Sequence, residues 1–418
     1  MLASTFIEPA LVVLVLVPGA LLGRRAAKAL GQPAVVGEIA ACLALGALLS
    51  SRVHWGTQSP GWDLFKELGH LGLCLFLVGA AHEIRGGGHR LPRRALAWLS
   101  AGSILVPMGA GALLAAWIIA GGGGPHLRGD SGTPAFVLML AIALAVTAVP
   151  VLAGILRDRR MEHTEEGRLS MASAVLIDAV TWVLLTLAIG LHKGGDGPLR
   201  AVLVVLGGAM GALALRRLAG TPAVDRAACG YPRAAVLAVG LLALGAARLT
   251  QDLGLSDVFG AVMVGLALPP DGGLGPWTRS ADLLGKLGRG LLPVLFLTAG
   301  TTLAAAPGGA FSWSATIVAT ALALAGKLVG SYLGARAGDQ PPISSFKLAA
   351  LMNTRGLTEI VILQIGYSAG LLPPALYVAL VIMALITTGL SGPLLWLADR
   401  IGTRAPVAAE PILQQVER

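Results

Sequence analysis

The sequence predicts an all-α polytopic membrane protein with about thirteen transmembrane helices. Of its 418 residues, 55% are hydrophobic and 13% are charged, and the mean hydropathy is +0.78. A soluble domain carries about 25% charged residues, so this composition excludes that class. The apolar residues also gather into runs long enough to cross a bilayer as helices. The predicted spans are residues 5–22, 34–50, 66–84, 95–119, 134–156, 169–191, 199–217, 233–249, 255–269, 288–304, 313–335, 345–368 and 374–397.

The basic residues between the spans predict the topology. Of the 31 Lys and Arg residues, most fall in every second loop, for example at positions 157–160 and 216–217. The positive-inside rule then places the N-terminus outside and the C-terminus in the cytoplasm. The net charge of +9 follows from this asymmetry and does not indicate a nucleic-acid partner. We expect one membrane domain over residues 1–400 and a short cytoplasmic tail over residues 401–418.

A weak internal repeat organises these spans. Residues 36–46 of the second span resemble residues 259–269 of the ninth, and residues 75–79 of the third resemble residues 295–299 of the tenth. Apolar segments rich in Gly and Leu also resemble each other by chance, but both pairs share an offset of seven spans. Six spans, one linker span and six further spans would invert the second unit, as in many secondary transporters.

Two spans at matching places in the repeat are predicted to be broken. Pro150 has no backbone N–H, so the fifth span is expected to break near Thr147, or to kink there. In the twelfth span, Asn353, Thr354 and Gly356 are poor helix formers at the centre of an apolar run. Unwound backbone persists at membrane depth where it lines a cavity. We therefore expect two crossed discontinuous helices whose ends face one ion site.

Asp178 is the most informative residue of the chain. It lies in the sixth span, where residues 170–185 are otherwise apolar or small. A carboxylate at that depth costs roughly 2.5–3.5 kcal/mol on insertion, so it is expected to face a cavity and to bind something positive. This pattern indicates an ion transporter.

Four other charged residues interrupt the spans. Lys327 in the eleventh is interpreted as a charge partner of Asp178 or of a half-helix C-terminus, with snorkelling to the interface as the alternative. Arg355 and Glu359 are four residues apart in the twelfth span, so they are expected to pair and to support its break. Glu38 in the second span is a candidate helper on the ion path, or else it makes a structural hydrogen bond.

Taken together, these motifs resemble the monovalent cation:proton antiporter superfamily. The nearest branch is the second, which includes Kef-type potassium systems and bacterial sodium/proton exchangers. The resemblance covers most of the chain, because the matching segments are residues 32–38, 147–151, 177–182, 259–261, 326–327, 353–359 and 387–393.

The resemblance implies a domain organisation and residue roles. Core helices within residues 95–191 and 313–397 would move against dimerisation helices within residues 5–84 and 233–304, with a linker helix at residues 199–217. A homodimer in a bacterial plasma membrane is expected. Asp178 matches the essential ion-binding aspartate, and Lys327 matches a basic residue common in the eleventh span. Ile177 departs from the polar residue usual before that aspartate, which leaves the stoichiometry open.

The function predicted is secondary antiport of Na+ or K+ against H+. A single buried carboxylate holds a proton or a cation but not both, so competition at Asp178 would couple the two fluxes. The Thr147 hydroxyl and unwound carbonyls of the fifth span would supply further oxygen ligands. Two alternatives are a cation channel or gated K+ efflux pathway on the same scaffold, and a carrier of an organic or complexed cation. No enzymatic activity, no cofactor and no metal other than the transported monovalent cation is expected.

Overall fold

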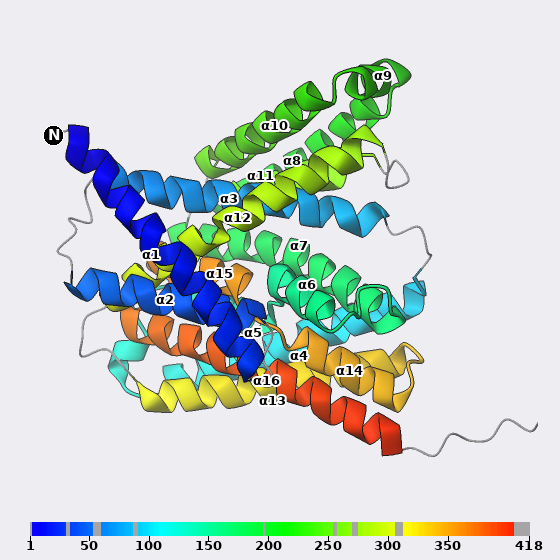
Figure 1. Ribbon diagram of the computed structural model, residues 1–418. Helices are drawn as coiled ribbons and strands as arrows, with labels where there is room; N and C mark the ends of the chain where they lie inside the picture. Colours follow the sequence, from blue (N-terminus) through cyan, green and yellow to red (C-terminus); the bar gives the residue numbers. More distant parts are fainter. Residues whose placement is uncertain are drawn as a thin grey trace, which may run out of the picture.

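The computed structural model describes residues 2–30, 34–52, 60–86, 91–194, 197–253, 257–269, 275–305 and 312–404. Within these residues the chain forms sixteen α-helices, one short 3-10 helix and no strand, which confirms the predicted all-α class (Figure 1). The helices are α1 (Leu2–Ala29), α2 (Ala34–Arg52), α3 (Pro60–Gly86), α4 (Arg93–Ile119), α5 (Thr133–Ala145), α6 (Val149–Asp158), α7 (Glu165–Lys193), α8 (Gly197–Ala219), α9 (Pro222–Gly230), α10 (Pro232–Asp252), α11 (Asp257–Ala267), α12 (Pro276–Ala305), α13 (Trp313–Ala337), α14 (Pro342–Met352), α15 (Leu357–Ser368) and α16 (Pro374–Arg404).

The long helices have the length and composition of membrane spans. In the described part of the chain, 7 helices are long and apolar enough to cross a bilayer. By contrast, α5, α6, α14 and α15 have 13, 10, 11 and 12 residues, so each is too short to cross alone. The molecule is a multi-pass membrane protein, and the count of about thirteen spans stays a prediction. Residues 405–418 of the predicted tail lie outside the described residues.

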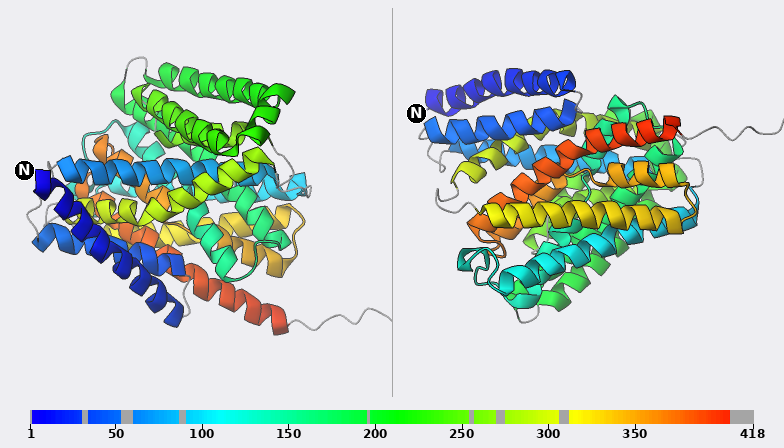
Figure 2. Two further views of the ribbon diagram at one scale, coloured as in Figure 1. Left: turned by 45° about the horizontal axis from the view of Figure 1, so that its top comes forward. Right: turned by 90° about the horizontal axis from the view of Figure 1, so that it is seen from below.

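The helices pack in two sets. In the first, which contains α1–α3 and α10–α12, α3 runs along α12 and α1 along α2. In the second, which contains α4–α7 and α13–α16, α4 runs along α13. The α9–α10 hairpin lies at one edge of the molecule, and α13 and α16 lie at the opposite edge (Figures 1 and 2). The division into a core and a dimerising scaffold, with their predicted roles, remains a prediction.

Small residues allow α4 and α13 to approach backbone to backbone. A Cβ added to Gly102 would collide with the Gly330 carbonyl oxygen, and one added to Gly334 would collide with the Trp98 carbonyl oxygen. The hydroxyls of Ser103 and Ser331 hydrogen-bond across the same interface over 2.6 Å. Small residues and interhelical hydrogen bonds of this kind are the usual basis of close helix packing in a membrane.

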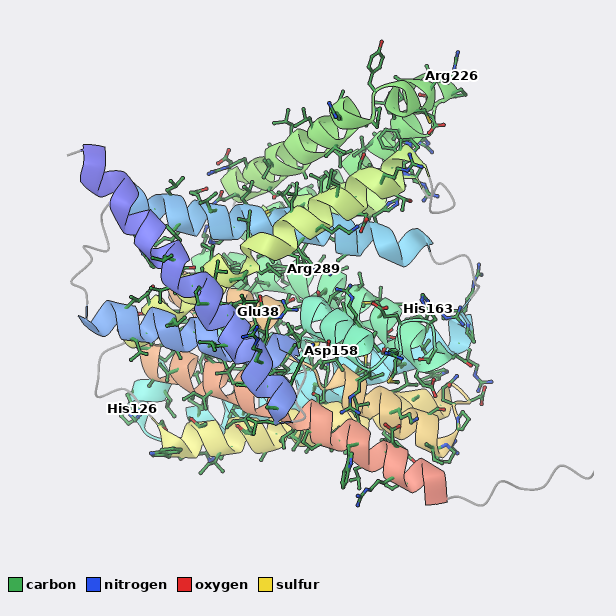
Figure 3. The ribbon with its side chains drawn as sticks, viewed as in Figure 1. Glu38, His126, Asp158, His163, Arg226 and Arg289 are labelled. Atoms are coloured by element: carbon green, nitrogen blue, oxygen red, sulfur yellow. The ribbon has the colours of Figure 1, made fainter. Side chains whose placement is uncertain are left out.

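The two sets meet where α2 abuts α6. Asp158, the last residue of α6, accepts a hydrogen bond from the Ala34 backbone N–H over 2.9 Å. It therefore caps the first turn of α2 from outside that helix. Both Asp158 and Glu38 lie in this region of the molecule (Figure 3).

Helix α7 carries Asp178, and its ends explain why it forms. The Thr164 hydroxyl accepts from the Gly167 N–H over 3.1 Å, which caps the first turn. Glu165 and Glu166 lie in that turn and Lys193 in the last, so the charges complement the helix dipole. Asp178 is thus held on a single continuous helix, which packs against α5, α6, α14 and α15.

One element was missed by the sequence analysis. Residues assigned there to a cytoplasmic loop form the short helix α9 between α8 and α10. Its 9 residues are too few to form a span, so the hydropathy criterion gave no signal for it.

Candidate ion-binding site

Two broken helices cross at the centre of the second set. The chain leaves helical geometry at residues 146–148 (the first break) and again at residues 353–356 (the second break). At the crossing, Ala148 N donates to Thr354 O over 3.0 Å, and Thr147 Oγ1 donates to Met352 O over 3.3 Å. Pro150 lies in the first turn of α6, where a missing N–H is tolerated. Both predicted breaks are confirmed, and the first is a true interruption rather than a kink.

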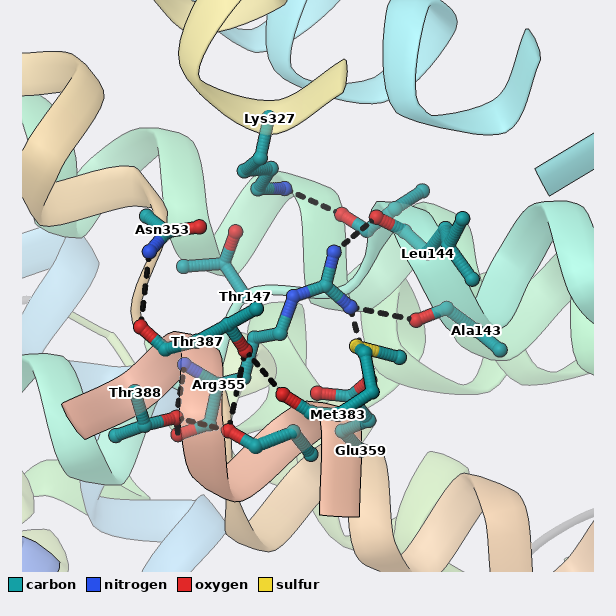
Figure 4. Close-up of polar contacts among 12 residues, drawn as sticks. Ala143, Leu144, Thr147, Lys327, Asn353, Arg355, Glu359, Met383, Thr387 and Thr388 are labelled. Atoms are coloured by element: carbon teal, nitrogen blue, oxygen red, sulfur yellow. Dashed lines mark hydrogen bonds and ion pairs between the residues drawn. The ribbon is translucent and has the colours of Figure 1, made fainter. Parts of the chain in front are cut away.

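Two cationic side chains cap the C-terminus of α5. Arg355 donates from Nη1 to Ala143 O over 2.8 Å and from Nη2 to Leu144 O over 2.5 Å. Lys327 Nζ donates to Ala145 O. The last three carbonyls of α5, which no residue of that helix can satisfy, therefore all receive charged donors (Figure 4). Positive groups are also favoured there by the negative end of the helix dipole.

Lys327 lies at this half-helix terminus and is fully buried. Its ammonium also donates to Ser103 O over 3.0 Å, so backbone oxygens of α4 and α5 both hold it. Among the described residues, no ion pair joins Lys327 to Asp178. Of the two partners considered for Lys327, the structure thus places the half-helix C-terminus in contact with it. Snorkelling is not observed, because the side chain is 0% exposed.

Arg355 and Glu359 form a buried ion pair. Arg355 Nη1 lies 2.8 Å from Glu359 Oε1, and both side chains are 0% exposed. One guanidinium therefore joins the start of α15 to the end of α5. Such a fork, always charged and with several donors in one plane, is suited to this double role.

The second break is held by residues of α16. Gly356 has φ +144°, a backbone conformation that side chains rarely permit. Thr388 Oγ1 accepts from Arg355 N over 3.1 Å and also lies 2.8 Å from Arg355 O, to which it can donate. Asn353 Nδ2 donates to Thr387 O over 2.9 Å. The unwound backbone is thus satisfied by a neighbouring helix, as membrane depth requires.

Replacing Thr388 tests this clamp. We expect Thr388→Val, which keeps the shape but removes the hydroxyl, to lower the unfolding free energy by about 1–3 kcal/mol, because the Arg355 backbone loses its partner. Thr388→Ser keeps the hydroxyl and is expected to stay close to the parent. Both variants are compared by their melting temperatures as purified proteins in detergent. Equal melting temperatures for the Val and Ser variants would refute the clamp.

Asp178 is buried without a hydrogen-bond partner. The residue is 4% exposed, and neither Oδ1 nor Oδ2 has a partner within the described chain. One turn further along α7, Trp182 is also buried, and its indole N–H is likewise unpartnered. Buried polar atoms are nearly always satisfied in folded proteins, so the unpaired carboxylate of Asp178 is a candidate position for a bound ion.

Four residues form what we call the central charge cluster: Asp178, Lys327, Arg355 and Glu359. All four are buried, and their formal charges cancel when all are ionised. The structure does not bring Glu38 into this cluster. Instead, Glu38 on α2 pairs with Arg24 on α1 over 3.3 Å, with 16% of its side chain exposed.

Three contributors to the site were not predicted from the sequence. Ser103 supplies the second carbonyl for Lys327, Ser331 bonds to the Ser103 hydroxyl, and Thr388 clamps the second break. The adjacent hydroxyls of Thr387 and Thr388 in an apolar span were a visible signal. The role of Ser103 depends on its backbone oxygen, for which a sequence contains no signal.

The fold and the site together define a membrane transporter with crossed, broken helices. The structure of the sodium proton antiporter MjNhaP1 from Methanocaldococcus jannaschii has the same fold: it aligns with a TM-score of 0.64 and 17% identity over 96% of this chain and 98% of that one.

Sequence comparison identifies the family. The transmembrane sodium/hydrogen exchanger family matches residues 12–396. Cation/H+ antiporter 18 of Arabidopsis thaliana is 31% identical over 93% of this chain and 48% of its own length. The Na+/H+ antiporter NhaS4 of Synechocystis is 31% identical over 87% of this chain and 90% of its own. The chain belongs to the sodium/hydrogen exchanger family, whose members are transporters and not enzymes, so the resemblance to cation:proton antiporters is confirmed. The chain spans about half the length of the Arabidopsis relative.

Proposed function

We propose that this protein exchanges Na+ or K+ for H+ by competition at Asp178. The observation that supports this most is the coordination of the central charge cluster. Lys327, Arg355 and Glu359 each have a hydrogen-bonded partner, whereas both oxygens of Asp178 have none. A buried carboxylate in that condition gains from binding either a proton or a cation, and binding one excludes the other.

Thr147 is proposed as a second oxygen ligand. Its hydroxyl donates its proton to Met352 O, so its lone pairs remain available to a cation. The carbonyls that end α5 are less suited, because Arg355 and Lys327 already occupy them. Na+ and K+ are hard cations that take oxygen ligands, as Mg2+ and Ca2+ do.

The charge of the cluster bears on the stoichiometry. With all four groups ionised the cluster is neutral, and it gains one positive charge whether a proton or a monovalent cation binds Asp178. Ile177 supplies no second proton carrier. We therefore propose one-for-one exchange, with the loaded forms of equal charge crossing between the two access states.

The cellular setting follows from the charge pattern and the packing. We propose a plasma-membrane protein with the N-terminus outside and the C-terminus in the cytoplasm, from the positive-inside rule. The set of helices that contains the cluster would move against the set that contains α3 and α12, and the latter would form a homodimer. Alternating access by relative motion of two such units is the usual mode of inverted-repeat transporters.

Reconstituted vesicles test the proposal. With an imposed proton gradient, we expect uptake of Na+ or K+ against the concentration gradient of that cation, measured by isotope flux together with a pH-sensitive dye. Uptake that only ever follows the cation's own gradient would indicate a channel and overturn the proposal. Proton flux driven by organic cations but not by Na+ or K+ would overturn the proposal and would indicate a carrier of an organic or complexed cation.

A further inference from the structure

We propose that the side-chain oxygen of Asn353 is a neutral ligand of the transported cation and sets the selectivity among monovalent cations. This inference rests on the proposed function and assigns a further residue to its site.

The orientation of the Asn353 amide is determined by its partner. Its Nδ2 donates to Thr387 O over 2.9 Å, and a backbone carbonyl can only accept. The amide therefore cannot be flipped without facing oxygen against oxygen. The side-chain oxygen Oδ1 is consequently directed away from α16.

That oxygen is a buried acceptor with no partner in the described chain. Asn353 is 0% exposed, and Oδ1 has no hydrogen bond. Folded proteins leave few buried acceptors unsatisfied, and such exceptions call for a bound group. Asn353 Oδ1 shares this condition with Oδ1 and Oδ2 of Asp178 on α7, the helix against which α14 packs.

The position of Asn353 suits it to a site shared with Asp178. Asn353 caps the C-terminus of α14, and α14 packs against α7, the helix that carries Asp178. In Figure 4 the amide lies on the side of the crossing where Thr147 and Lys327 lie, whereas Glu359 lies beyond Arg355. An oxygen there lies on the Thr147 and Lys327 side of the crossing rather than at the Arg355–Glu359 pair.

A neutral amide oxygen acts on the two competing ions differently. It can coordinate Na+ or K+, but it does not take up a proton in the physiological range. Asn353 would therefore favour the metal ion over the proton at a site where Asp178 alone binds both. Its fixed position would also favour cations of one radius.

Cation dependence of exchange in reconstituted vesicles tests the inference. For Asn353→Ala we expect the Na+ or K+ concentration at half-maximal exchange to rise about tenfold, and the ratio of the Na+ and K+ values to change. The proton concentration at half-maximal exchange, measured at low cation, should stay unchanged. Gln340→Ala is the matched control, since it removes a side-chain amide outside the site, where Gln340 Nε2 donates to Glu165 Oε1, and its Na+ to K+ ratio should equal that of the parent.

The outcomes separate the inference from the function on which it rests. If the unmodified chain exchanges no cation for protons, the proposed function fails. If it exchanges and Asn353→Ala keeps the parent's cation dependence and Na+ to K+ ratio, the inference alone is overturned. If a variant folds but does not transport, cation binding is measured instead of flux, as the increase in melting temperature caused by NaCl or KCl relative to choline chloride. If Asn353→Ala does not fold, Asn353→Ser takes its place. The same rise in the cation concentration at half-maximal exchange is expected, and the parent's cation dependence would again overturn the inference.

Discussion

Asp178→Asn is expected to reduce proton-coupled cation exchange to the level of empty vesicles. The amide has nearly the shape of the carboxylate, but it has no charge to hold a cation and no site for a transported proton. Folding should be retained, because Asp178 makes no hydrogen bond in the described chain that the substitution would break. Removal of a buried charge also removes its desolvation penalty. The measurements are pH change in vesicles on addition of Na+ or K+, and the melting temperature in detergent.

Asp158→Asn is the matched control for that substitution. It makes the same chemical change at a carboxylate outside the central charge cluster, and an asparagine can still accept from the Ala34 N–H. We expect its exchange rate to equal that of the parent. Normal exchange by Asp178→Asn, or equal loss in both variants, would refute Asp178 as the shared site.

Arg355→Ala should cause the largest loss of stability of any single substitution considered. It leaves the Glu359 carboxylate buried without its cation, and it leaves Ala143 O and Leu144 O without donors. Removal of one partner from a buried ion pair typically costs about 3–5 kcal/mol, because the remaining charge stays in the interior. We therefore expect a large fall in melting temperature in detergent and little folded protein.

Two further variants identify the origin of that loss. Arg355→Lys keeps the charge but not the fork of donors, so an intermediate stability is expected. In the Arg355→Ala background, Glu359→Gln removes the uncompensated charge and should restore part of the stability, a coupling measured by a double-mutant cycle. An Arg355→Ala protein that melts with the parent would contradict the structural role of this pair.

The two breaks were predictable because their causes are local. Pro150 lacks an N–H, and the run from Asn353 to Gly356 combines poor helix formers with an isolated charge. These residue types predict where the helices end. The presence of Asp178 in an apolar helix was equally plain. Each of these signals depends on a residue and its immediate neighbours alone.

The partners of the charges were not predictable in the same way. Lys327 binds carbonyl oxygens of Ser103 and Ala145, which are 224 and 182 positions away in the sequence. Every residue has a carbonyl, so no residue type indicates which one is accepting. From the sequence, two partners were therefore open for Lys327, and only the three-dimensional arrangement places it against the end of α5.

The close approach of α4 and α13 has a mechanical consequence. Lys327 extends from α13 to oxygens of α4 and α5, and the glycines between α4 and α13 leave no gap in which the two helices could slide. We therefore expect α4 and α13 to move as one rigid unit that carries the Lys327 ammonium. The positive charge of Lys327 is then expected to keep its position when a cation or a proton binds at Asp178, so that either ion meets a fixed electrostatic field.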